Sequence, residues 1–293
     1  MELNSLSNWA YWQLGLSIMA LAFVLYGIYF LIRTGKRIPQ LEADWEGDCA
    51  FMPQVDVKDD VVSISNFRDF HWRTTRDRDE IWINRSVKID ELENIWYVVD
   101  HFSSMKGMAH IMLSFEFKDG NHLTASFECR RRKGQRYDPW KGLWRNYELC
   151  LVWGTERDLI GLRTNVRGNK VHLYRVTSTP EKKKALFLEL CHRSQQLTTN
   201  AEWYNSLFTT CLTSIVQQVN RITPNRIPLT WRYLLPGHST RAALRLGLIE
   251  DWGGYRKTVK QGQLEALERK STDDEFLFSK MIRERMPESS TNN

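Results

Sequence analysis

The sequence predicts an α+β globular domain carried on a single N-terminal transmembrane helix. Three observations support this class. Residues 3–32 contain no charged residue, the middle of the chain alternates apolar and polar residues as strands do, and two later segments have helical periodicity with capping residues. The chain has 293 residues, of which 42% are apolar and 26% charged, so it can bury a core and is neither fibrous nor wholly disordered.

The N-terminal apolar run predicts a membrane anchor. Leu14 to Ile32 is 19 residues, or about 28 Å of helix, which matches a bilayer core. No Lys or Arg precedes the run and no small-x-small site follows it, so a cleaved signal peptide is disfavoured. We therefore predict an anchor at 1–37, a tether at 38–60, a catalytic domain at 61–252, and charged helices with a disordered tail at 253–293.

Charge and cysteine content limit the partners. The formal net charge of +6 is spread along the chain, which fits an anionic bilayer better than a nucleic acid. The five cysteines form no C-x-x-C pair and no ligand-spaced cluster with histidine. We predict no metal site, no cofactor and no disulfide framework.

The clearest strand pair is a hairpin over residues 110–130. Apolar residues at odd positions alternate with polar ones on both sides of Asp119-Gly120. Keeping both apolar rows on the core face places Phe117 opposite Leu123. In that register His110 and Glu128 are diagonal neighbours on the polar face.

Other elements follow from the same rules. We predict strands at 61–70, 94–102, 147–154, 159–164 and 170–176, and a surface turn or short helix at 77–93. A helix is predicted from an N-cap at Ser178 to about Leu197. A second, amphipathic helix is predicted at 207–222, with Phe208 and Cys211 on its apolar face.

One constellation could carry chemistry. Cys211 near a helix N-terminus would be the nucleophile, because the helix dipole favours the thiolate. His110 would be its base, and Glu128 would orient the imidazole. The pattern alone leaves simpler interpretations open: a core cysteine, a surface histidine, and a carboxylate paired with the arginines that follow it.

Several motifs occur together in a fixed order. They are N-F-R-D-F at 66–70, A-H at 109–110, S-F-E-C-R-R at 126–131, Y-E-L at 147–149, E-R-D-L at 156–159, L-R-T-N at 162–165, and W-Y-N at 203–205 leading to Cys211. Together they resemble the Lnb N-terminal periplasmic domain family, whose characterised branch is a lipoprotein N-acyltransferase. The resemblance spans about residues 43–252.

The resemblance implies a circularly permuted papain-like (NlpC-type) domain in which the histidine precedes the cysteine. It implies ping-pong transfer of an acyl chain from a membrane phospholipid, through a thioester on Cys211, to the N-terminal amine of a lipoprotein. It also implies substrate-binding roles for a second set of residues: Arg130, Tyr147, Tyr204 and Asn205. One position departs from the family, because Thr210 stands where an Asn typically precedes the nucleophile and would replace it only in part.

Two questions stay open from the sequence. The same fold would serve an amidase or peptidase acting on cell-wall peptide, and a degenerate site would leave a non-catalytic envelope assembly protein. The family places the domain in the periplasm on an inner-membrane anchor, whereas Arg33, Lys36 and Arg37 after the anchor favour the cytoplasm. We expect the periplasmic orientation.

Overall fold

The chain forms two units in the computed structural model. The structure describes residues 3–105, 107–224, 226–228, 235–267 and 274–287. Unit one, Met1–Pro39, contains helix α1 (Leu3–Gly35), and unit two, Gln40–Asn293, is the globular domain. Within α1, Trp12–Gly35 has a mean hydropathy of 2.2 and is long enough to cross a membrane. The single apolar N-terminal helix is thus confirmed, whereas the end of the predicted tail, 288–293, lies outside the described residues.

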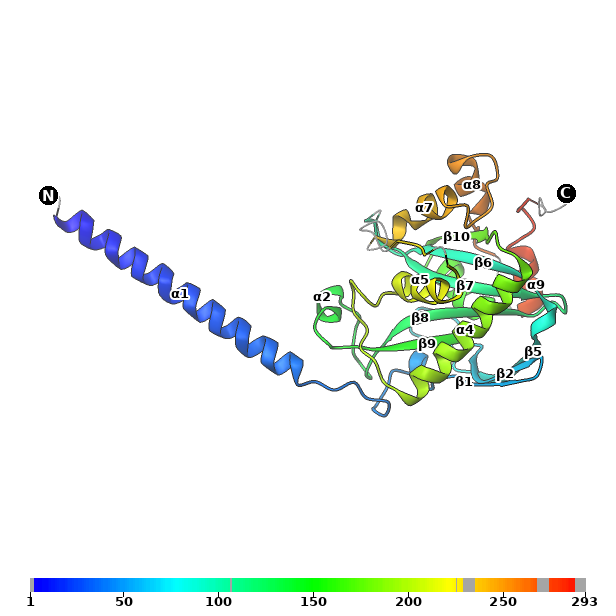
Figure 1. Cartoon of the computed structure of the whole chain (residues 1–293), viewed down its shortest axis with the longest axis horizontal. Coiled ribbons are helices and arrows are strands. Elements are labelled where there is room, and N and C mark those ends of the chain that lie inside the picture. The colour runs from blue at the N-terminus through cyan, green and yellow to red at the C-terminus, as the bar shows by residue number, and fades with distance from the viewer. Residues whose placement is uncertain (1–2, 106, 225, 229–234, 268–273, 288–293) are drawn as a thin grey trace. The chain divides into compact units, whose positions relative to one another are not determined.

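A mixed sheet forms the centre of the globular domain (Figure 1). Its strands lie in the order β1-β2-β9-β8-β7-β6-β10, and β5 also pairs with β2. Their bounds are β1 (Gln54–Lys58), β2 (Val61–Arg68), β5 (Trp82–Lys88), β6 (Leu92–His101), β7 (His110–Phe117), β8 (His122–Arg130), β9 (Glu148–Gly154) and β10 (Lys170–Arg175). A separate two-stranded ribbon pairs β3 (His71–Trp72) with β4 (Arg78–Asp79).

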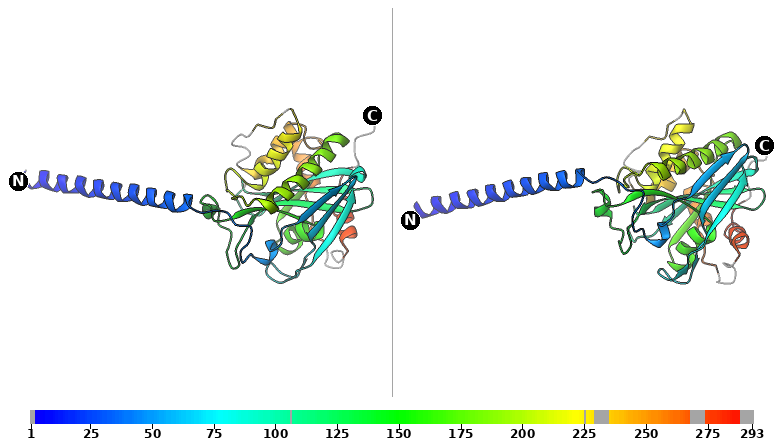
Figure 2. Two further views of the ribbon diagram at one scale, coloured as in Figure 1. Left: turned by 60° about the horizontal axis from the view of Figure 1, so that its bottom comes forward. Right: turned by 90° about the horizontal axis from the view of Figure 1, so that it is seen from below.

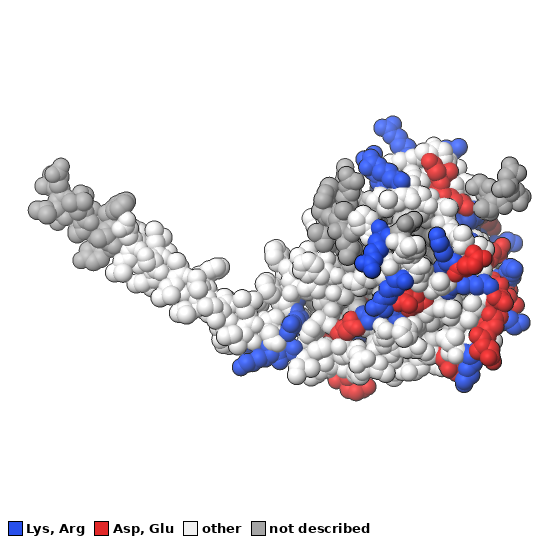
Figure 3. Space-filling view, viewed as in Figure 1, with Lys and Arg blue, Asp and Glu red and all other residues white. Residues whose placement is uncertain are grey.

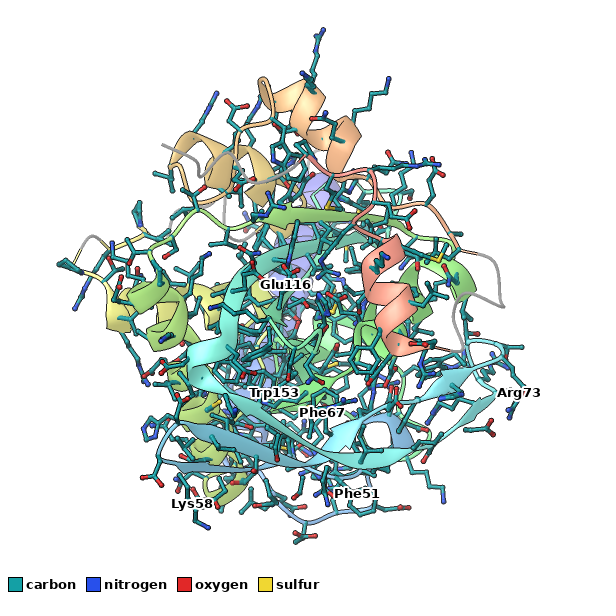
Figure 4. The ribbon with its side chains drawn as sticks, turned by 90° about the vertical axis from the view of Figure 1, so that its right-hand side faces the viewer. Phe51, Lys58, Phe67, Arg73, Glu116 and Trp153 are labelled. Atoms are coloured by element: carbon teal, nitrogen blue, oxygen red, sulfur yellow. The ribbon has the colours of Figure 1, made fainter. Side chains whose placement is uncertain are left out.

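Helices cover both faces of the sheet (Figure 2). One core lies under α4 (Pro180–Thr199) and α5 (Cys211–Ile222), and a second lies under α3 (Glu156–Gly161) and α9 (Glu275–Met281). The first core includes Phe67 and Trp153, which Figure 4 shows inside the domain, with Lys58 and Arg73 at its periphery. The remaining helical pieces are η1 (Gly47–Cys49), η2 (Ile89–Glu91), α2 (Pro139–Gly142), η3 (Leu162–Val166), η4 (Pro236–His238), α7 (Ser239–Arg245) and α8 (Tyr255–Gly262). The combination is a mixed α+β fold.

The β7–β8 hairpin has the predicted faces in a different register. Phe115 pairs with Leu123 and Glu116 with His122, so the pairing is shifted by two residues from the predicted one. The reason is the loop: the Phe117 N–H donates to the Asn121 carbonyl at 2.9 Å, and Gly120, with φ of 87°, closes a three-residue turn over 118–120. If this register is continued to the first residue of β7, His110 lies directly opposite Glu128.

Three further expectations are corrected. Residues 159–164 are helical and not a strand, because the Thr155 hydroxyl caps α3 and this helix runs into the π-helical turn η3. The 77–93 segment contains strand β5, whose partner is β2. The Thr179 hydroxyl, and not Ser178, caps α4.

The domain extends beyond the predicted boundaries. Strand β1 comes from the segment expected to be a tether, and the Gln195 side chain of α4 donates to the Val55 carbonyl at 3.0 Å. At the other end, α9 buries Phe278, and Arg283 pairs with the buried Glu156. Local composition does not reveal contacts between residues that are far apart in the sequence. The predicted domain was therefore shorter at both ends than the observed one.

The sheet has one narrow join. Strands β2 and β9 run parallel and pair only through Arg68 and Gly154. The Thr155 N–H adds a bond to the Arg68 carbonyl at 2.9 Å. The buried Asp158 carboxylate reinforces the join, because it accepts bonds from the Arg68 guanidinium at 2.7 and 2.8 Å and from the Phe70 N–H at 3.0 Å.

Candidate active site

The fold brings the three predicted catalytic residues into one cavity. His110 is the first residue of β7, Glu128 lies near the end of β8, and Cys211 is the first residue of α5. All three line a cavity of about 330 Å³. They are separated by up to 101 positions in sequence, yet the strand ends and the start of α5 meet at the same edge of the sheet.

Direct contacts connect the three side chains. The His110 Nε2 atom lies 3.2 Å from Glu128 Oε1. The Cys211 side chain lies close enough to His110 to contribute to the raised pKa of the imidazole. The backbone N–H of Ile111 donates to the Cys211 sulfur at 3.4 Å. Cys211 is buried, with 7% of the residue exposed.

Ser126 lies between the imidazole and the carboxylate. Its hydroxyl is 2.7 Å from His110 Nε2 and donates to Glu128 Oε1 at 2.8 Å. Ser126 was not among the predicted catalytic residues, although Ser126 and Glu128 are two apart on one strand and so share a face. That spacing was the available signal.

Burial and charge together set the protonation of this pair. Burial lowers the pKa of His110, but the Glu128 carboxylate and then the Cys211 sulfur outweigh burial and raise it to about 10. Burial raises the pKa of Glu128, but His110 and Arg163 hold it well below its ordinary value of 4.5. His110 is therefore an imidazolium at neutral pH, and a positive charge beside a thiol is typical of cysteine nucleophiles.

Arg163 also binds the Glu128 oxygen that faces His110. Its Nη2 donates to Glu128 Oε1 at 2.9 Å, and its Nε forms an ion pair with Asp100 at 3.1 Å. Its Nη1 donates to the Leu159 carbonyl at 2.6 Å. Arg163 sits in η3, and π-helical turns often occur at functional sites.

Thr210 provides a complete helix cap beside the nucleophile. Its hydroxyl accepts from the Thr213 N–H at 3.2 Å, and the Thr213 hydroxyl accepts from the Thr210 N–H at 2.8 Å. This capping box starts α5 at Cys211, so Phe208 precedes the helix and is 71% exposed, contrary to the prediction. Thr210 therefore caps the helix fully where the family typically has Asn.

Of the four residues predicted to bind substrate, the structure places one on the cavity wall. Tyr204 lines the cavity, and its hydroxyl is 3.2 Å from that of Tyr137. Arg130 donates to the carbonyls of Leu41, Cys49 and Ala50 and so holds the segment before β1.

The other two stabilise connections near the cavity. The Tyr147 hydroxyl accepts from the Asp138 N–H at 2.9 Å and donates to the Arg136 carbonyl at 2.8 Å. The Asn205 side-chain oxygen accepts from the N–H groups of Leu207 and Phe208. Neither residue lines the cavity.

The cavity has walls of two kinds. Apolar walls are formed by residues from several connections, among them Phe102, Met108, Leu162 and Leu235. A charged wall carries the guanidinium groups of Arg68, Arg131, Arg163 and Arg167. Two other thiols, Cys49 and Cys129, also line it, and burial raises the pKa of Cys49 to about 12.

The described part of the chain contains no cluster of three or more His, Cys, Asp or Glu side chains able to hold a metal ion. All five cysteines belong to that part, and all are free thiols.

Comparison with known proteins identifies the family of the chain. A family model described as the Lnb N-terminal periplasmic domain matches residues 78–237, just over half of the chain. The chain belongs to the Lnb N-terminal periplasmic domain family. The match covers His110, Glu128 and Cys211. No curated protein and no solved structure matches the chain. An Lnb domain with one N-terminal apolar helix is consistent with a single-pass membrane protein whose domain is periplasmic.

Proposed function

We propose that this Lnb-family chain is a cysteine-dependent acyltransferase that moves an acyl chain from a membrane phospholipid to the N-terminal amine of a lipoprotein. The observation that carries the proposal is that Cys211, His110 and Glu128 line one cavity, with His110 3.2 Å from Glu128 and the neighbouring Ile111 N–H bonded to the Cys211 sulfur. The imidazole precedes the thiol in the chain, as in a circularly permuted papain-like domain.

The geometry supports a two-step reaction. The Cys211 thiolate attacks the ester carbonyl carbon of the phospholipid, and a C–S bond forms. The ester C–O bond then breaks, and the His110 imidazolium gives its proton to the leaving alkoxide. In the second step the lipoprotein amine attacks the thioester, the C–S bond breaks, and His110 takes the amine proton.

The start of α5 can stabilise the intermediate. The N–H groups of the first helical turn have no partner within the helix, and Cys211, the first residue of α5, lines the cavity. A tetrahedral oxyanion formed next to the sulfur would accept from the Cys211 N–H and would be favoured by the helix dipole.

The two kinds of wall fit a phospholipid. The apolar residues would contact the acyl chain. Arg131 and Arg167 would lie near the headgroup phosphate, which arginine binds well. Arg131 is already paired with Asp48, whereas the Arg167 guanidinium has no ion pair with any described carboxylate.

Mass spectrometry of the full chain with phospholipid tests the nucleophile. We expect a mass increase of one acyl chain on Cys211 and no adduct in Cys211→Ala or His110→Ala. Cys129→Ala is the matched control, because Cys129 lines the same cavity and burial raises its pKa. An adduct that persists in Cys211→Ala would contradict the assignment.

The charged wall also favours a second candidate. Arg167, which has no ion pair with a described carboxylate, and Arg131 on the same cavity wall would suit a carboxylate of a cell-wall peptide, and an amidase or peptidase would use the same thiol. The acyl acceptor separates the two. Incubation of the acylated chain with a diacylglyceryl-cysteine peptide should give an N-acyl peptide, whereas transfer to water alone, together with release of amine from cell-wall fragments, would favour the hydrolase.

The proposed location is the inner membrane, with the domain in the periplasm. Alkaline phosphatase fused after residue 293 should be active in cells. An inactive fusion would place the domain in the cytoplasm, as Arg33, Lys36 and Arg37 favour.

A further inference from the structure

Large apolar side chains are exposed around the mouth of the cavity. They come from three connections: Phe102 and Met105 between β6 and β7, Trp140 and Trp144 between β8 and β9, and Leu207 and Phe208 before α5. We call these six residues the rim. Trp140 is 75% exposed, Phe208 71% and Met105 61%. An exposed cluster of apolar side chains marks a surface that contacts another molecule, because these side chains do not contribute to the folded core.

Hydrogen bonds join two of the connections into one surface. The Ser206 N–H donates to the Gly142 carbonyl at 3.3 Å, and the Tyr137 and Tyr204 hydroxyls lie 3.2 Å apart. The rim also borders the cavity directly. Phe102 lines it, Pro139 lines it next to Trp140, and Ser206 lines it next to Leu207.

Basic residues accompany the rim. The connection over residues 131–147 contains six: Arg131, Arg132, Lys133, Arg136, Lys141 and Arg145. Its one acidic residue, Asp138, is used to cap α2. Figure 3 shows a largely uncharged surface over α2, whereas basic and acidic side chains are mixed on the opposite side of the domain. Tryptophan with Lys and Arg suits the interface of an anionic bilayer, where the ring enters the headgroup layer and the cations meet phosphate.

We propose that the rim docks the globular domain onto an anionic phospholipid bilayer, so that the cavity of Cys211 opens at the lipid surface. This contact is additional to α1. It complements the proposed function, since it would give acyl chains a direct path to the thiol, but it does not depend on any reaction.

A labelling experiment tests the docking. The full-length Cys211→Ala chain is reconstituted in vesicles of phosphatidylcholine and phosphatidylglycerol that contain a phospholipid with a photoactivatable diazirine in its acyl chain. After illumination, labelled peptides are identified by mass spectrometry. We expect adducts on α1 and on the peptides that carry Trp140, Trp144 and Phe208. We expect none on the peptide with Phe276 and Leu277, which are also exposed but lie on α9 at the other end of the domain (Figure 1).

Two variants sharpen the result. Trp140→Ser with Phe208→Ser should lower rim labelling at least fivefold and leave α1 labelling unchanged. The matched control, Phe276→Ser with Leu277→Ser, should change neither. Vesicles of phosphatidylcholine alone should lower rim labelling but not α1 labelling.

The opposite outcome is equally clear. If α1 is labelled while the rim peptides are labelled no more than the α9 peptide, the rim does not meet lipid, and a protein partner would then be the better explanation for its exposure. Because Cys211→Ala cannot form a thioester, this result is independent of whether the proposed acyl transfer is correct.

Discussion

His110 is charged at neutral pH chiefly because the Glu128 carboxylate faces it. Glu128 Oε1 lies 3.2 Å from its Nε2. Alternation placed His110 and Glu128 on one strand face and helical periodicity placed Cys211 near a helix start, but the pattern alone left simpler interpretations open, and the resemblance to the Lnb family supported the catalytic one. Ser126 and Arg163 complete the network only in the observed register and with the π-helical turn, and neither can be read from periodicity.

The titration of His110 provides the first prediction. In Glu128→Gln the largest influence that raises the pKa of His110 is gone, so its midpoint should fall from about 10 by about 1–3 units. NMR of labelled imidazole nitrogens measures this. An unchanged midpoint would mean that Glu128 does not control the imidazole.

The titration of His110 should also make the free energy of unfolding depend on pH. The folded pKa of His110 is raised above its ordinary value of 6.5, so its contribution to the free energy of unfolding is complete below pH 6.5 and is lost as pH rises to about 10. The difference in unfolding free energy between the wild type and His110→Gln should therefore shrink across that range in denaturant titrations. A difference that grows with pH would contradict it.

Ser126 should act by positioning. Ser126→Ala removes one bridging hydrogen bond, which predicts a fall in kcat of about tenfold with little change in KM. Thr124→Val is the matched control, because Thr124 is equally buried on the same face of β8 but its hydroxyl has no partner among the described residues. Equal losses in both variants would indicate a general packing effect.

At the level of elements, the start of α5 places the nucleophile. Thr210 and Thr213 close a reciprocal cap, and this cap sets the first helical residue at Cys211. The sequence predicted the helix but started it four residues early, at Leu207, because the apolar stripe continues through Phe208 into the loop.

Loss of this cap should be measurable. Thr210→Ala should destabilise the domain by about 1 kcal/mol and slow alkylation of Cys211 by iodoacetamide. Thr210→Asn, which restores the residue typical of the family, should keep both properties near the wild type. Chemical denaturation and alkylation rates test this, and an unaffected Thr210→Ala chain would show that the cap is dispensable.

Helix α9 is a second element whose role the sequence obscured. Arg283 donates to the fully buried Glu156 at 2.7 Å, and Glu156 also accepts from Ser114 on β7. Burial raises the pKa of Glu156, but Arg283 outweighs burial and lowers it to about 2. The charged C-terminal segment is thus part of the core.

Removing that arginine should be costly. Arg283→Ala leaves a buried carboxylate unpaired and should destabilise the domain by about 3–5 kcal/mol. Because the folded pKa of Glu156 is depressed, the stabilisation is present above pH 4.5 and is lost as pH falls toward 2. Urea titrations at several pH values check this. Adding Glu156→Gln should recover part of the loss, and no recovery would point to packing instead of charge.

On the scale of the whole molecule, local signals predicted the anchor helix and most of the sheet. The limits of the domain were missed at both ends, because β1 and α9 owe their positions to partners more than 100 residues away: Gln195 donates to Val55, and Arg283 to Glu156. The composition of these two segments is polar or charged, which is typical of a linker or a tail. Their distant hydrogen-bond partners can be identified only in the folded chain.

The narrow join between β2 and β9 has a consequence for the cavity. Within the sheet, β1, β2 and β5 connect to the other five strands through one residue pair and the bonds around Asp158, while Gln195 of α4 and the shared apolar core hold them from outside the sheet. Arg68 belongs to the smaller group and also lines the cavity, while His110, Glu128 and Cys211 belong to the larger part. The wall that carries Arg68 is therefore joined to the rest of the cavity through few sheet hydrogen bonds, whereas the thiol and its imidazole sit within the continuous ladder of β7 and β8 and the start of α5.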